Sequence, residues 1–134
     1  MIREHYDGIY ALIPATVGKH YGQVKADGLT YPYVVLWGDM GAETTEALSS
    51  TPDTLELRPR ITYVASGFEQ LMWLIDEVRP ALSQAIPIVT GWVPSRMFQN
   101  SLTDAQTDFD VTIPNTSRNP MFAVDEFVLS SQRQ

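Results

Sequence analysis

The sequence predicts an α+β domain with a mixed, mostly antiparallel β-sheet and two main α-helices packed on one face. Two segments, 2–13 and 68–82, carry apolar residues at helical spacing, whereas the other apolar segments are short and β-rich. Several of these follow one another without a helix between them, which favours antiparallel neighbours. The 134 residues are the size of one domain and show no repeat or linker, so we expect a single domain over 1–134.

The first helix is expected over 2–13, where apolar and charged residues fall on opposite faces. Pro14 should end this helix. A short strand interrupted by glycine is then expected over 17–24.

Residues 31–37 read Tyr-Pro-Tyr-Val-Val-Leu-Trp, an apolar run rich in β-branched and aromatic types. Such a run predicts a strand buried on both faces, and we place it at the centre of the sheet. Pro32 is tolerable because it stands at the beginning of the strand, where a missing N–H costs least.

The segment 39–52 is polar, small and acidic, and it has no basic residue. We expect a long exposed loop here. Loops of this length are uncommon inside a compact domain and often have a function, although a solvated connector without a role remains an alternative.

Residues 54–65 alternate between apolar and polar side chains, which predicts one half-exposed strand. Ser66 and Glu69 have the spacing of a capping box, so the second helix should begin there. Pro80 should kink or stop this helix near Arg79, because it removes a backbone hydrogen bond and crowds the preceding turn.

Three further strands are predicted towards the end of the chain. The stretch 86–98 contains two prolines and a glycine and indicates a bent or edge strand. Residues 109–113 alternate, and 121–129 form a nearly continuous apolar run apart from Asp125-Glu126, for which Arg58 or Arg60 could supply an ordinary ion pair. Residues 130–134 should be a short polar tail.

Composition excludes several classes of function. The net charge of −7 and the presence of only two lysines argue against tight nucleic-acid binding, which depends on clustered cations. An acidic surface remains compatible with DNA passing without sticking. No apolar run approaches the roughly 20 residues that span a bilayer, and the opening residues lack the layout of a secretory signal, so we expect synthesis in the cytoplasm and no membrane partner.

The sequence shows no catalytic machinery. It lacks cysteine, and its two histidines lie near no nucleophile motif; His5 is expected to face solvent and His20 to sit in a strand or turn. No phosphate-binding glycine loop or calcium-loop spacing occurs. We therefore predict no catalytic residue, cofactor or metal, and we interpret the acidic groups as solvated faces: Asp39, Glu43 and Glu46, and Asp104, Asp108 and Asp110.

Trp73 falls off the apolar stripe of the second helix. It either widens the buried face or is exposed where another subunit covers it, and tryptophan is a common anchor of protein interfaces.

The order of elements, the Tyr-Pro-Tyr-Val-Val-Leu strand followed by Gly-Asp and an acidic loop, and the closing strand from Asn119 resemble tail terminator proteins of long-tailed bacteriophages. The resemblance implies a virion protein at the head–tail junction, a homohexameric ring that caps the tail tube, ends its polymerisation and offers a surface to head-completion or connector proteins. DNA would pass through its lumen. As interface residues we expect the following: Asp39, Glu43, Glu46, Asp53 and Trp73.

Two alternatives remain at this point. A head–tail connector or other neck protein would share the size, acidity and ring formation. A small hydrolase or ligand-binding enzyme would instead show a deep pocket with converging polar groups, whereas a ring protein should show flat apolar patches.

Overall fold

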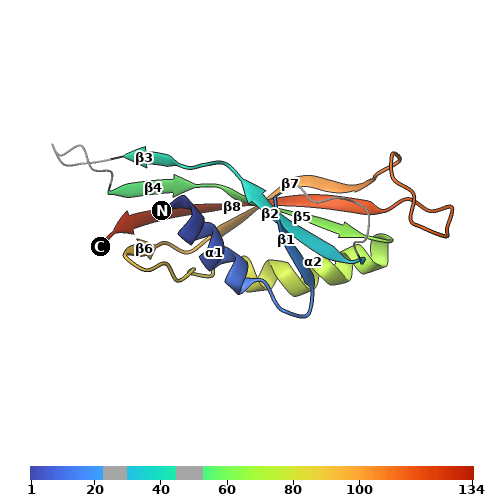
Figure 1. Cartoon of the computed structure of the whole chain (residues 1–134), viewed down its shortest axis with the longest axis horizontal. Coiled ribbons are helices and arrows are strands. Elements are labelled where there is room, and N and C mark those ends of the chain that lie inside the picture. The colour runs from blue at the N-terminus through green and yellow to red at the C-terminus, as the bar shows by residue number, and fades with distance from the viewer. Residues whose placement is uncertain (23–29, 45–52) are drawn as a thin grey trace.

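The computed structural model describes residues 1–22, 30–44 and 53–134, which form two helices and eight strands (Figure 1). The helices are α1 (Ile2–Leu12) and α2 (Phe68–Leu82), and the strands are β1 (Gly18–Tyr21), β2 (Tyr33–Gly38), β3 (Ala42–Thr44), β4 (Thr54–Leu57), β5 (Pro59–Ala65), β6 (Trp92–Pro94), β7 (Phe98–Thr107) and β8 (Met121–Arg133).

Strand β8 organises the sheet. Its first part lies between β5 and β7, and its last part lies between β4 and β6, in each case antiparallel. Strand β2 pairs antiparallel with β5, β3 pairs antiparallel with β4, and β1 runs parallel to β2. The predicted mixed, mostly antiparallel sheet is therefore confirmed. The prediction that 31–37 is central is wrong, because β2 lies one strand from the edge.

Both helices cover the same face of the sheet, as predicted (Figure 1). One core cluster joins side chains of α1 and α2 to alternate residues of β2, β5 and β8. Along β5, for example, Ile61, Tyr63 and Ala65 are fully buried, while the residues between them are partly exposed. Strand β2 is buried on both faces from Tyr33 to Leu36, which confirms that part of the prediction.

The ends of α2 differ from the prediction. The N-cap is Gly67 without a side-chain cap bond, and the Ser66 backbone N–H and hydroxyl both donate to Gln70 Oε1 instead of forming a box with Glu69. The helix also continues past Pro80 to Leu82. Leu82 is fully buried in the core and the N–H of Ser83 bonds to the Arg79 carbonyl, so packing and hydrogen bonding offset the local cost of proline.

The predicted strand 54–65 is two strands that meet at Arg58. The backbone N–H of Arg58 donates to Asp39 Oδ1 at 2.9 Å, so it is not used for hydrogen bonding between neighbouring strands. The predicted loop 39–52 is wrong in part, because β3 lies within it and pairs with β4. Residues 45–52 of that loop and 23–24 of the first predicted strand lie outside the described residues.

Three predictions for the last third need correction. Of 86–98, only Trp92–Pro94 and Phe98, the first residue of β7, lie in strands, and 109–113 belong to the segment that joins β7 to β8. Strand β7 was not predicted, because its largely exposed residues show no apolar alternation. The expected tail 130–134 is wrong, since β8 continues to Arg133 with Ser131 buried.

Asp125 and Glu126 in β8 are both buried and face opposite sides of the sheet. Arg60 pairs with Glu126 at 3.0 Å, as the sequence suggested. Asp125 is held on the helix side by Arg79 of α2 through two bonds of 2.8 Å, by the Tyr63 hydroxyl at 2.8 Å and by Gln99 at 3.2 Å. Burial first, and then the negative charge of Asp125, raises the pKa of Tyr63, which keeps this hydroxyl a donor.

Replacing Arg79 with methionine should lower the free energy of unfolding by about 3–5 kcal/mol, because it leaves the buried Asp125 carboxylate without its cation. Arg58→Met is the matched control: Arg58 is exposed and bonds Asp39 only through its backbone, so the change should stay within about 0.5 kcal/mol. Urea denaturation measures both. Equal effects of the two substitutions would contradict this role of Arg79.

Candidate assembly surface

The arm is the pair of strands β3 and β4, which forms the edge at one end of the sheet, where β4 pairs with the last part of β8 (Figure 1). At its base, Asp39 accepts the Arg58 N–H through its carboxylate, and its carbonyl accepts the Tyr6 hydroxyl at 2.6 Å. Burial first, and then the charge of Asp39, raises the pKa of Tyr6 to about 12, so the hydroxyl remains a donor at neutral pH. The carbonyl of Asp39 therefore connects the arm to α1, and its exposed carboxylate carries a negative charge.

The other predicted acidic residues lie further along the arm. Glu43 is exposed on β3 opposite Leu55 of β4. Asp53 precedes β4, and its carbonyl accepts the N–H of Arg133 at 2.8 Å. Glu46 lies outside the described residues. The structure thus brings Asp39, Glu43 and Asp53 onto one arm and leaves Trp73 on a separate element.

Trp73 is 46% exposed on the outer side of α2. Phe68 and Met72 on the same helix are also about half exposed, so α2 presents an apolar patch to solvent. A patch of large apolar side chains on a water-soluble chain often marks a surface that another protein covers.

A second set of exposed apolar side chains lies in β6 and in the segment that leads to it from α2. It consists of Ile86, Ile88 and Val93. This group was not predicted from the sequence, because 86–98 was interpreted as one strand. The available signal was the run Ile-Pro-Ile-Val, whose proline, together with Gly91 and Pro94 after the run, argues against a regular buried strand.

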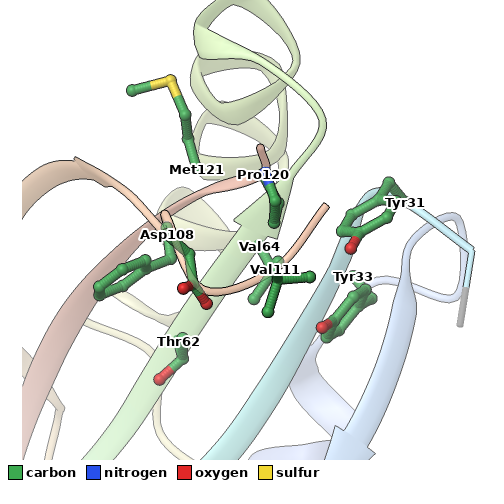
Figure 2. Close-up of a pocket in the computed structure, with 9 residues that line it drawn as sticks. Tyr31, Tyr33, Thr62, Val64, Asp108, Val111, Pro120 and Met121 are labelled. Atoms are coloured by element: carbon green, nitrogen blue, oxygen red, sulfur yellow. The ribbon is translucent and has the colours of Figure 1, made fainter. Parts of the chain in front are cut away.

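A pocket of about 270 Å³ lies on the sheet face away from the helices (Figure 2). Figure 2 shows Tyr31 and Tyr33 on one side of Val64 and Asp108 on the other. The Thr62 hydroxyl at its floor already accepts the indole N–H of Trp37 at 2.8 Å, and Asp108 accepts the backbone N–H of Asp110. The lining is mostly apolar, and its polar groups do not converge as a nucleophile and base would.

His5 does not face solvent, contrary to expectation. It is fully buried, with Nε2 bonded to Ser131 Oγ at 2.8 Å, Nδ1 bonded to the Met1 carbonyl at 2.6 Å and its ring edge-on to Trp92. Since a carbonyl only accepts, Nδ1 donates to Met1, and Nε2 shares the second hydrogen bond with the serine hydroxyl. The pair resembles a nucleophile and its base, but both residues are buried and no carboxylate orients the ring. It joins α1 to β8. His20 lies in β1, edge-on to Tyr33.

Among residues 1–22, 30–44 and 53–134, no group of three or more histidine or acidic side chains could hold a metal ion. The helices that the structure describes are too short or too polar to cross a bilayer.

No family model and no curated protein matches the chain. A solved structure does: a chain in the virion of a native gene transfer agent particle superposes with a TM-score of 0.54. The match has 16% sequence identity and covers 91% of this chain and 84% of the other. At this identity, the two chains share a fold over nearly their whole length.

Trp73→Ala should change the free energy of unfolding by less than about 1 kcal/mol, because nearly half of the side chain is already in water. The neighbouring Leu74 is fully buried, so Leu74→Ala should cost about 2–5 kcal/mol. Chemical denaturation of both variants tests this assignment of the two faces of α2. A large loss in Trp73→Ala would place Trp73 in the core.

Proposed function

We propose that this chain is a structural virion protein that forms a homohexameric ring at the end of a tail tube, in the manner of a tail terminator. The observation that carries the proposal is the fold shared with a virion chain over 91% of its length. The sequence resemblance to tail terminators supplies the finer role: capping the tube and offering a surface to head-completion or connector proteins.

The surface supports assembly rather than catalysis. Large apolar side chains are exposed on α2 and between α2 and β6, as expected of a subunit whose neighbours cover them. The pocket on the open sheet face is lined mostly by apolar groups, and the described serine–histidine pair is buried beyond the reach of a substrate. These features favour the ring protein over a small hydrolase or ligand-binding enzyme.

The charge of the chain is consistent with a ring that lets DNA pass. A net charge of −7 makes nonspecific attraction to phosphates weak, because binding depends on cations that release counterions. A lumen with this character would not retain the DNA. The partners are then other copies of the chain, the tube protein and a head-completion or connector protein.

The acidic arm is the part of the subunit suited to reach a neighbouring subunit or the tube. It forms the edge at one end of the sheet, Asp39 holds its base, and Glu43 and Asp53 lie along it. We include Trp73 and also Glu46, which follows β3 in the sequence and lies outside the described residues, as further interface residues.

The direct test is the mass of the purified protein by light scattering, alone and after mixing with tail-tube assemblies, followed by imaging of the tube ends. A ring at tube ends that stops elongation is the expected result. A protein that ignores tubes at every concentration would contradict the proposal. Binding to the head vertex without binding to tubes would favour a neck protein instead.

Neutralising the arm should weaken tail joining. The variant Glu43→Gln, Glu46→Gln, Asp53→Asn is expected to give fewer infectious particles, because it removes three of the charges that we propose as partner contacts. Asp39 stays unchanged, since its carboxylate holds the Arg58 N–H. The control removes an exposed charge away from both the arm and α2, in Asp110→Asn. Equal particle yields from the triple variant and this control would exclude a specific role for the arm.

A further inference from the structure

The pocket on the open face of the sheet has an aromatic side and a charged side. Tyr31 and Tyr33 form the first, with ring centroids 5.7 Å apart, and Asp108 stands on the other side of Val64 (Figure 2). Apart from the Thr62 hydroxyl, the rest of the lining is apolar. A volume of about 270 Å³ lies just below the range of pockets that hold drug-sized ligands, so the pocket suits one long side chain.

Asp108 is the only charged side chain among the described residues that line the pocket. None of the described ion pairs includes it. Its Oδ1 accepts the backbone N–H of Asp110 at 3.1 Å, and no described hydrogen bond reaches Oδ2. Arg118 of the same segment and His20, whose ring lies edge-on to Tyr33 at 5.8 Å, are both absent from the lining. Within the described residues, the charge of Asp108 is therefore not compensated by a cation.

The Asp108 carboxylate is also held in position. Its own backbone N–H donates to the Pro120 carbonyl at 2.9 Å, and its Oδ1 accepts the Asp110 N–H. The pKa of Tyr33 is raised by burial first, then by Tyr31 and by the charge of Asp108, so this carboxylate lies within electrostatic reach of the Tyr33 phenol. The two sides of the pocket can therefore act on the same occupant.

The carboxylate decides what kind of occupant is favourable. Any group that fills the pocket removes water from Asp108, and an apolar side chain would leave this charge without a partner, which is strongly unfavourable. A cation compensates the charge, and tyrosine rings attract it further. Arginine is favoured over lysine, because its guanidinium group is planar, is more weakly hydrated than an ammonium group and stacks on aromatic rings.

We propose that this pocket binds the guanidinium group of an arginine side chain of a partner protein, between the two tyrosine rings and the Asp108 carboxylate. The pocket lies on the sheet face away from the helices, apart from the arm and the exposed side of α2, so this contact is additional to the proposed assembly surface. The net charge of −7 favours the approach of a basic partner surface.

The test is a nuclear magnetic resonance titration of the isotope-labelled, full-length protein with N-acetyl-arginine amide, which mimics arginine within a polypeptide. The backbone amide signals of Val64 and Asp108 should shift and saturate, with a dissociation constant on the order of 1 mM for so small a ligand. The matched control ligand is N-acetyl-citrulline amide, whose urea group has the shape of a guanidinium without its charge. It should bind at least tenfold more weakly. Equal binding of the two ligands, or no shift with the arginine amide up to its solubility limit, would overturn the proposal.

Two matched substitutions separate the charge of Asp108 from the overall charge. Asp108→Asn keeps an oxygen for the Asp110 N–H but removes the charge, and should weaken binding of the arginine amide at least tenfold. Asp110→Asn removes a charge from an exposed residue outside the lining, and should change binding less than about twofold. Equal losses in both variants would contradict a specific role for Asp108.

The aromatic side is tested at Tyr31, which is only partly buried. Tyr31→Phe keeps the ring and should retain binding within about threefold, whereas Tyr31→Leu removes the ring and should lose at least tenfold. If Tyr31→Leu binds as well as the natural protein, the rings do not hold the guanidinium. Circular dichroism checks that the variants fold, and the comparison with citrulline needs no variant at all.

Two further titrations identify the source of the arginine. A site for a side chain should bind the blocked amide at least as well as free arginine, so a tenfold preference for free arginine would indicate a metabolite site and overturn the role of a partner protein. The same signals shifting with protein concentration, without any ligand, would assign the arginine to a second copy of the chain and also overturn it. These titrations contain no tail tubes, so their outcome is independent of the test for tube capping.

Discussion

The fold depends on the pairing of β8 on both of its sides along most of its length. Its first part hydrogen-bonds to β5 and β7 and its last part to β4 and β6, so four strands distant in sequence are held in register by one. The charged pair Asp125-Glu126 lies within this strand, one residue on each face, and each has an arginine partner. An error in register of one residue would exchange these faces and bury each carboxylate without its cation.

The same arrangement explains which surfaces remain uncovered. Two helices cover one face of the sheet, but α2 is amphipathic only in part and leaves Phe68, Met72 and Trp73 in water. The chain then reaches β6 through a segment whose buried Val89 and outward Ile88 alternate. A subunit with unlike apolar features at two ends is suited to assembly with its own copies.

Much of the fold could be predicted from the sequence, because the spacing of apolar residues indicates which side chains are buried. The helices and the strand 31–37 carry strong apolar patterns, and the helix starts were nearly right. Strand β7 could not be predicted, since most of its side chains are exposed. Within the described residues it pairs with β8 alone, so one of its edges is unpaired. The break at Arg58 and the continuation through Pro80 depend on contacts with Asp39 and the core, which no local pattern contains. For the candidate site, the exposure of Trp73 could be predicted, because this residue lies outside the apolar stripe of the second helix. The exposure of Ile88 could not be predicted, because it follows from the burial of Pro87 and Val89 in the folded chain.

The central claim is that the exposed apolar features at the two ends are covered together when the chain assembles. Hydrogen exchange with mass spectrometry, comparing the free subunit with the protein bound at tube ends, measures this directly. We expect the backbone amide hydrogens of 68–76, 101–105 and 86–93 to exchange more slowly in the bound protein. Those of β8, which are already hydrogen-bonded on both sides, should change little. Protection of only one of these regions, or protection confined to the pocket around Tyr31 and Val64, would contradict it.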